Sequence, residues 1–528
     1  MASRWRSAGE ALAHAVRGPA MRARGFTEGV NSVTQPKGLS AIMKASRIRD
    51  LSRRAMLYQT AAASGLGGIY AMSASAQQGT PGRVPTGGPG MPAFPGRGAA
   101  PVHYGPINKF SSPSDLKITD IRALRVAANF DYPIIKIFTN QDVYGLGEVR
   151  DAGNENLALA MKPLLVGRSP LDISGILQSV RPYAGPGRQG GGFSAIDIAL
   201  HDITGKVFGV PVWRLLGDKK RDRVRMYCDT TGTRDPKKYG ERMIARMKLG
   251  FTFFKMDVTT NFIGGTPGNL DTEGVPTDKG LEYGGELIGA VRDAIGWDKP
   301  LSVDAASLRC GTVTDGIRAA KAFEKYRLSW LEDLFYTGGF WRWKDFKEIK
   351  AHTSTKLLTG EDGFGLEEGF QQLIDNRAVD IIHLDHGTSG GCSETKRIAD
   401  YAYDRERIPT AIHMAGSPLA TIAAVHTAAT LQSYIAMECH AVDFLSWWQQ
   451  LITGVSQPLI DKGYITVPDA PGLGVELNEP VVREHLRTPG YFDPATKWDD
   501  SITGRGLGGP WPHFNVDGVW VNERTADY

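Results

Sequence analysis

From residue 224 onward, short apolar runs alternate with longer amphipathic stretches, and each run is followed by a polar or charged residue. Short strands that alternate with helices are typical of βα units in a parallel sheet. Eight such units predict a (β/α)8-type barrel over residues 219–480, and hence an α/β fold. From the third run on, the polar ends recur every 24–29 residues, at positions 304, 332, 361, 385, 413 and 438.

The segment before the barrel, residues 115–218, has a different pattern. Its first part alternates apolar and polar residues in KITDIRALRVAA, PIIKIFTN and VYGLGEV, which predicts a small antiparallel meander. Helical patterns follow near 154–164, 170–181 and 194–208, and Gly209 and Pro211 end the last of them. We therefore expect a separate N-terminal α+β domain that caps the barrel.

Residues 1–76 have the features of an export signal. Arg53-Arg54 precedes a weakly hydrophobic stretch rich in Ala and Gly, and Ala74-Ser75-Ala76 offers a cleavage site. This order of parts resembles a twin-arginine signal and predicts a periplasmic or otherwise exported protein. The alternative is an N-terminus with a chance Arg-Arg pair and a cytoplasmic protein. Met43 is a second candidate for the true start.

Residues 77–114 are rich in Gly and Pro, which predicts a flexible linker that cannot bury a core. The formal net charge of +4 arises in the leader, because residues 1–58 hold 11 Lys/Arg and three Asp/Glu. The mildly acidic remainder gives no reason to expect a nucleic acid partner. The chain lacks an apolar run of about 20 residues, so we expect no stable membrane insertion after processing. The tail, 481–528, is expected to pack on the cap or the barrel.

The four cysteines are scattered, and they form no Cys-x-x-Cys pair. A zinc site, a redox motif or a disulfide framework is therefore not expected. We interpret them as buried packing residues.

Three carboxylates end consecutive strands of the predicted barrel: Asp304, Glu332 and Glu361. The carboxyl ends of barrel strands meet at one mouth, where the catalytic residues of such barrels lie. Three converging carboxylates repel one another unless a cation joins them, and oxygen ligands suit Mg²⁺. The pattern predicts one Mg²⁺ per site. The alternative is that some of them cap helices or form loop salt bridges.

Asp385 and His413 end the next two strands. A carboxylate beside an imidazole fixes its tautomer and raises its basicity, so this pair predicts a general base. His386 follows Asp385 directly and is a candidate substrate contact. His383, two residues before Asp385, could point into the barrel.

Lys255 ends the second strand after the apolar run FTFF, and its cation could bind a substrate carboxylate or move a proton. Asp257 lies two residues further on and faces the same side. Glu438 ends the eighth strand, where it could donate a hydrogen bond if protonated or pair with Lys255. We include all three among the candidate catalytic residues.

Seven motifs in this order resemble the mandelate racemase/muconate lactonizing enzyme family of the enolase superfamily. The resemblance covers about residues 116–480 and implies an enolase-like modified TIM barrel with a capping domain. By this similarity Asp304, Glu332 and Glu361 take the metal positions, and Asp385 and His413 the catalytic dyad. The motifs are AIDIALHDITGKVFGVPVWRLLG, VD at 303–304, LED at 331–333, GED at 360–362, LDHGTSGGCSE, IPTAIHMAGSPLA and AMEC.

Weaker similarity in HMAGSPLATIAAVHTAATLQ and in the tail DGVWVNERTADY points to galactonate-type sugar-acid dehydratases. The resemblance implies a Mg²⁺-dependent hydro-lyase that removes the α-proton of a sugar acid, passes through an enediolate and expels the β-hydroxyl as water. Its partner would be a small carboxylate sugar, and members of this group often form dimers to octamers. A racemase, epimerase or cycloisomerase on the same scaffold is the first alternative, and a non-catalytic sugar-acid binding protein the second.

Two departures from the family pattern concern proton transfer. Asp257 stands where two-base racemases carry a second lysine, and Ala306 stands where related dehydratases carry a His as general acid. The acid that protonates the leaving hydroxyl is therefore unassigned. His413 could serve if elimination is syn, and Asp257 or a loop residue is the alternative. In the cap, Tyr144 and Arg188 are the expected substrate-binding residues.

Overall fold

All residues of the chain that the structure describes belong to one compact unit, 99–528. The predicted signal and linker lie outside the described residues, so export remains an expectation. None of the described helices is long and apolar enough to cross a membrane. This computed structural model describes residues 115–335, 342–440, 445–499, 513–514 and 520–521.

Strands β4 to β11 form a closed parallel barrel, because each pairs with the next and β11 pairs back with β4. The predicted (β/α)8-type barrel is confirmed. In-register pairs such as Asp304 with Glu332 and His413 with Asp385 bring the polar strand ends to one level. The strands are β4 (Arg223–Thr230), β5 (Phe254–Asp257), β6 (Leu301–Asp304), β7 (Leu331–Glu332), β8 (Leu357–Thr359), β9 (Ile381–Asp385), β10 (Thr410–His413) and β11 (Tyr434–Cys439).

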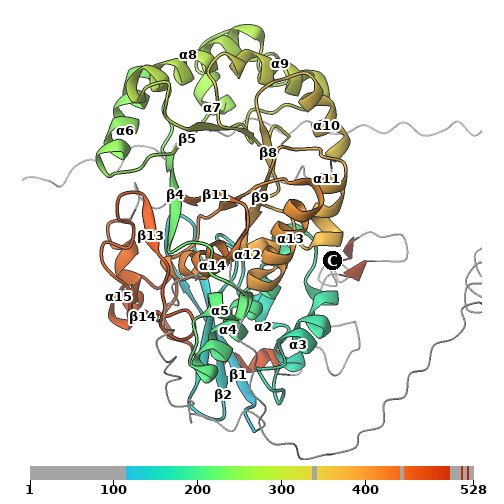
Figure 1. Cartoon of the computed structure of the whole chain (residues 1–528), viewed down its shortest axis with the longest axis vertical. Helices are drawn as coiled ribbons and strands as arrows, with labels where there is room; N and C mark the ends of the chain where they lie inside the picture. The colour runs from blue at the N-terminus through green and yellow to red at the C-terminus, as the bar shows by residue number, and fades with distance from the viewer. Residues whose placement is uncertain (1–114, 336–341, 441–444, 500–512, 515–519, 522–528) are drawn as a thin grey trace, which may run out of the picture. The chain divides into compact units, whose positions relative to one another are not determined.

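Helices surround the barrel strands (Figure 1). Helix α9 shows why they form where they do: Thr312 and Asp315 make a capping box at its start, and its small and apolar face is buried. Between β8 and β9 a π-turn, Leu366–Phe370, precedes the short helix α11. The helices are α6 (Pro236–Lys248), α8 (Asp278–Ile295), α9 (Val313–Glu324), α10 (Trp343–Ala351), α11 (Gln371–Asp375), α13 (Gly391–Glu406) and α14 (Pro418–Thr430).

The barrel interior is filled with side chains, so substrate can reach only its mouth. Tyr227, Phe253 and Trp330 pack against one another there, and Leu358, Ile381, Ala411 and Ala436 complete this cluster. All four cysteines are buried and free, as the packing interpretation predicted.

The capping domain is an antiparallel sheet of β1 (Ile118–Val126), β2 (Tyr132–Thr139) and β3 (Tyr144–Glu148) packed on helix α4 (Gly191–Phe208). The helix expected over 154–164 is instead the short α2 (Asn156–Leu159) followed by a 3-10 turn. Pro163 lies in that turn, and a proline lacks the amide that would continue an α-helix.

The chain after the barrel returns to both domains. Strand β13 (Tyr464–Thr466) pairs antiparallel with β4, and Leu486 forms a bridge with Val126 of the cap sheet. The guanidinium of Arg487 pairs with Asp131 beside the same sheet. Residues 464–487 therefore contact the barrel and the cap in turn.

Glycines let β3 approach α4 closely. A Cβ atom at Gly147 would lie 2.0 Å from the carbonyl oxygen of Ala195, which is helix backbone and cannot move aside. We expect Gly147→Ala to lower the free energy of unfolding by about 1–3 kcal/mol or more. Urea unfolding measures this change. Gly311→Ala is the control, since a Cβ there meets nothing within 4 Å; equal losses in the two variants would contradict the prediction.

Candidate active site

Lys255 joins three carboxylates at the barrel mouth. Its Nζ lies 3.0 Å from Asp304 Oδ2, 2.7 Å from Glu332 Oε1 and 2.9 Å from Glu438 Oε1. Burial opposes the charge on Lys255, but the neighbouring carboxylates outweigh it and raise its pKa well above the ordinary value. Lys255 therefore stands here as a cation, in contact with two of the three predicted metal ligands.

Glu361, the third predicted ligand, lies two residues beyond β8 and faces the cap. Arg150 Nη2 approaches its Oε1 to 3.4 Å and Arg188 Nη2 to 3.6 Å. Burial raises the pKa of Glu361 to about 8 even though Arg150 and Lys255 act in the opposite direction. Burial likewise raises the pKa of Glu332 well above its usual range. These carboxyl groups need more positive charge nearby to be ionised at neutral pH.

The donor set fits a hard divalent cation. Ligand atoms of Glu332, Glu361 and His383 lie within 4.8 Å of one another. Asp304 is close to them, because Asp304 and Glu332 both contact the ammonium of Lys255. Carboxylate oxygens are the ligands that Mg²⁺ prefers. Asp333 Oδ2, beside them, is buried without a hydrogen-bond partner among the described residues. The residues that would hold the ion are Asp304, Glu332 and Glu361.

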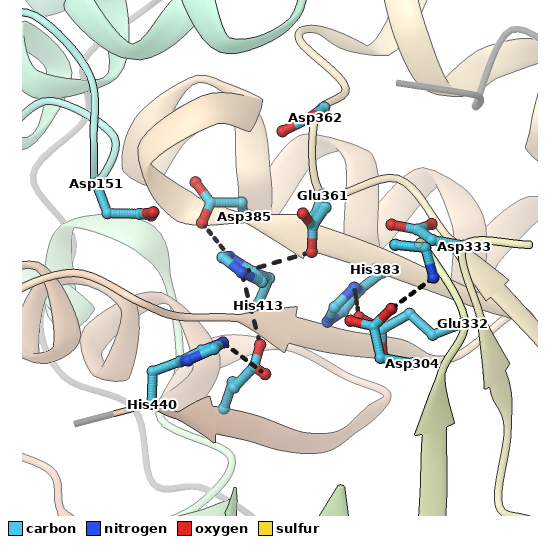
Figure 2. A network of polar contacts seen from close by, with 12 residues as sticks. Asp151, Asp304, Glu332, Asp333, Glu361, Asp362, His383, Asp385, His413 and His440 are labelled. Carbon is cyan, nitrogen blue, oxygen red and sulfur yellow. Dashed lines mark hydrogen bonds and ion pairs between the residues drawn. The ribbon is translucent and has the colours of Figure 1, made fainter. Parts of the chain in front are cut away.

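His413 lies at the centre of the mouth (Figure 2). Its Nδ1 is 2.7 Å from Asp385 Oδ2, and its Nε2 faces Glu361 Oε2 at 3.5 Å and Glu438 Oε2 at 3.7 Å. Burial, helped by the cation of Arg150, holds the pKa of His413 well below its ordinary value, so the ring is neutral. A neutral imidazole whose Nδ1–H donates to Asp385 carries a lone pair on Nε2, as a general base requires.

Arg150 is a site residue that the sequence reasoning missed. It follows β3 of the cap, is almost fully buried, and its Nη1 lies 2.9 Å from Asp385 Oδ2 and 3.0 Å from the carbonyl oxygen of Glu361. Its Nε is 3.3 Å from Asp151 Oδ1. The guanidinium thus holds the dyad's carboxylate and ties the cap to the mouth. The charged pair Arg150-Asp151, directly after the third predicted strand, was the available signal.

His440 and Asp229 form a second imidazole–carboxylate pair that the sequence reasoning did not select. His440 Nδ1 lies 3.2 Å from Asp229 Oδ2, and its Nε2 lies 3.4 Å from Glu438 Oε1. Figure 2 shows His440 on the side of His413 away from Asp385 and Glu361. The two imidazole ring centres are 6.1 Å apart. Residues two apart in a strand lie on the same face, so His440 could have been predicted to face the mouth together with Glu438.

Polar contacts also reach down into the barrel. Tyr227 donates from its hydroxyl to Glu438 Oε2 at 3.1 Å and lies 3.0 Å from His383 Nε2. His383 Nδ1 is 3.5 Å from Glu332 Oε1. His383 therefore points into the barrel, with its ring between Tyr227 and Glu332.

The remaining predicted site residues differ in where they lie. Asp257 is paired in register with Asp304, and burial raises its pKa well above the ordinary range. Arg188, from the cap, reaches the mouth with its Nε 2.7 Å from Asp362 Oδ1, and 45% of its side chain is exposed. Asp257 and Arg188 therefore belong to the assembled site.

The structure does not bring Tyr144 and His386 to that site. The Tyr144 hydroxyl donates to Glu476 at 2.7 Å, and two lysines contact its ring. His386 is fully buried, and its Nε2 lies 3.0 Å from the Thr427 hydroxyl on α14. Within the described residues, neither side chain forms a hydrogen bond or ion pair with the mouth carboxylates or with His413, and neither has a role in the proposed mechanism.

A closed parallel barrel whose mouth combines three carboxylates with a carboxylate-oriented imidazole defines an enolase-type barrel enzyme. Residues 121–217 match the mandelate racemase / muconate lactonizing enzyme N-terminal domain family, and residues 238–481 match the enolase C-terminal domain-like family. The chain belongs to the mandelate racemase/muconate lactonizing enzyme family of the enolase superfamily. The predicted resemblance is confirmed.

Relatives and solved structures agree with this assignment. A D-xylonate dehydratase of Haloferax volcanii is 31% identical, covering 70% of this chain and 89% of that protein. A D-galactonate dehydratase family member of Musicola paradisiaca is 30% identical over 70% of this chain and 94% of its own. A mandelate racemase/muconate lactonizing enzyme-like protein of Rubrobacter xylanophilus superposes with a TM-score of 0.65 at 29% identity, covering 71% of this chain and 99% of that chain.

A structure described as an enolase from Pantoea ananatis with bound D-gluconate and Mg superposes with a TM-score of 0.61 at 27% identity. It covers 71% of this chain and 96% of that one. In that relative a metal ion and a sugar acid are therefore bound together on a similar fold.

Proposed function

We propose that this protein is a Mg²⁺-dependent hydro-lyase that dehydrates a sugar acid to a 2-keto-3-deoxy acid. The observation that carries the proposal is the His413–Asp385 pair, at 2.7 Å, facing the carboxylates of the same mouth. The dehydratases among the relatives, and the relative with D-gluconate and Mg, support the substrate class.

His413 is the base in this mechanism. Asp385 orients its ring, and Arg150 in turn holds Asp385, so Nε2 faces Glu361 and Glu438 at the mouth. A sugar acid placed there presents its α-carbon to Nε2, which removes the proton. A divalent cation held by Asp304, Glu332 and Glu361 would supply positive charge beside the substrate carboxylate, where negative charge develops as the proton leaves.

Lys255 and Arg188 are the proposed substrate-binding cations. Lys255 lies beside Asp304 and Glu332, so its ammonium group can bind a substrate carboxylate next to the cation that these two residues would hold. Arg188 comes from the cap and is half exposed over the mouth, where it can donate to the hydroxyls of the sugar chain. The cap would in this way select the length and stereochemistry of the substrate.

A racemase is the less favoured function. A two-base racemase needs a second base facing His413 across the substrate. Lys255 there is surrounded by three carboxylates, and the next residue of that strand facing the mouth is Asp257. One well-oriented base fits an elimination better than a two-base inversion.

The proposal is tested by screening the full chain against aldonates and aldarates with Mg²⁺ in D2O. We expect a 2-keto-3-deoxy acid from at least one sugar acid. Deuterium at the α-carbon without any keto acid would replace the proposal by a racemase or epimerase. Binding of a sugar acid with neither reaction would replace it by a binding protein.

Metal removal is a separate prediction. After dialysis against EDTA we expect keto-acid formation to stop, because the buried carboxylates then lack the charge that the reaction needs. Adding Mg²⁺ should restore the rate, which a keto-acid assay follows. Full activity in EDTA would contradict the assignment of Asp304, Glu332 and Glu361 as metal ligands.

A further inference from the structure

We propose that His440 is the general acid that protonates the leaving β-hydroxyl. This inference rests on the proposed dehydration. Elimination of hydroxide from a sugar acid is slow unless a proton reaches the departing oxygen, so the site needs an acid as well as a base. His413 is the base of the proposed reaction, so a second group has to supply this proton.

The position of His440 suits this role. It follows Glu438 by two residues at the end of β11, next to β10, which carries His413. Its ring centre lies 6.1 Å from that of His413. A substrate whose α-carbon lies over His413 Nε2 therefore has its neighbouring carbon, and the hydroxyl on it, within reach of His440.

His440 is also oriented as an acid should be. Asp229, at the end of β4, lies 3.2 Å from Nδ1 and orients the ring, while Nε2 faces the mouth beside Glu438 at 3.4 Å. The ring of Phe130 packs against that of His440 in a T-shaped arrangement, with ring centres 5.7 Å apart. Asp229 and Glu438 thus fix the orientation of the ring, with one carboxylate at each ring nitrogen.

Solvent access separates the two histidines. The side chain of His440 is 20% exposed, against 6% for His413. An acid that gives up its proton in each turnover must regain one from water, and the partly exposed ring can do so.

The other candidates fit less well. Ala306 has no proton to give, and its backbone amide donates to Asp304 Oδ1 at 2.8 Å. Asp257 is buried between Asp229 and Asp304, on the side of the mouth away from β10. His413 would have to remove the proton from the α-carbon and, in the same step, deliver a proton to the oxygen on the β-carbon. A separate acid avoids this double role.

The step balances as follows. His413 takes the α-proton, and the electron pair of that C–H bond forms the carbon–carbon double bond. The β-carbon–oxygen bond breaks with its pair on oxygen, which takes the proton of His440 Nε2 and leaves as water. The enol loses its hydroxyl proton and gains one at the β-carbon, giving the keto acid. His440 then recovers a proton from solvent, and His413 releases its own.

The test compares wild type and His440→Asn on a sugar acid that the screen identifies, and on the analogue with fluorine in place of the β-hydroxyl. Fluoride leaves without a proton. We expect His440→Asn to slow keto-acid formation by about 10²–10⁴-fold. Deuterium exchange at the α-carbon and fluoride release should stay within a few-fold of wild type.

A structural role for His440 would reduce all three readouts together, and unchanged dehydration would show that the acid lies elsewhere; either result overturns the proposal. Asp229→Asn is the second variant, expected to give the same pattern with a smaller loss because the ring remains. If wild type exchanges the α-proton but forms no keto acid, the dehydratase proposal itself fails and His440 loses this role with it.

Discussion

His413→Asn is expected to abolish both α-proton exchange and keto-acid formation. Asn fills a similar space beside Asp385 but has no nitrogen that accepts a proton. General-base catalysis by a positioned side chain contributes about 10²–10⁴-fold, and we expect a loss of that size in each reaction. The two rates are read from one incubation in D2O, by NMR of recovered substrate and by a keto-acid assay.

The contrast with His440→Asn makes this result specific. Removing the base should stop exchange and dehydration together, whereas removing the acid should stop dehydration alone. His352→Asn is the control, because His352 directly follows α10 at the surface and its ring pairs with Glu348 of that helix. Continued exchange in His413→Asn would show that another group is the base.

Asp385→Asn tests the support of that base. It removes the charge that Arg150 and His413 share, at 2.9 and 2.7 Å, but leaves the imidazole in place. The loss should therefore be smaller than in His413→Asn and should again affect exchange and dehydration equally. A loss of dehydration alone would assign Asp385 to a different step.

The strand ends could be predicted because their signal is local. Each apolar run is followed by a polar residue, and barrel topology alone brings such residues to one mouth. Asp304, Glu332, Asp385 and His413 were found in this way, and the structure places them together. His440 carried the same local signal, two residues after Glu438, but its partner Asp229 lies on β4, which becomes a neighbour only when the barrel closes.

The cap residues could not be placed from the sequence, because their contacts span long separations. Arg150 contacts Glu361, 211 positions away, and nothing near Arg150 indicates that partner. Tyr144 and Glu148 are the two ends of β3, about 13 Å apart at ~3.3 Å per residue. Glu148 is the end that meets the barrel, where the Ser417 amide donates to it at 2.9 Å, so Tyr144 points elsewhere.

Lys255→Met is expected to make the stability of the protein depend strongly on divalent cations. In wild type, the ammonium of Lys255 contacts Asp304, Glu332 and Glu438, and its side chain is 2% exposed. Removing one partner of a buried ion pair costs about 3–5 kcal/mol, because the remaining charge is left without compensation. In EDTA we therefore expect a loss of this size in the free energy of unfolding, measured with urea.

With Mg²⁺ present, the ion would replace part of the missing charge, and binding to the folded state alone adds stability. The deficit of Lys255→Met should then shrink. Lys206→Met is the matched control: Lys206 also pairs with two carboxylates, Asp202 at 2.8 Å and Glu476 at 3.1 Å, but on the cap helix α4. Its deficit should be the same in EDTA and in Mg²⁺. If the stability loss of Lys255→Met were also the same in EDTA and in Mg²⁺, the mouth carboxylates would not bind the ion. The proposed reaction would then lack its metal site.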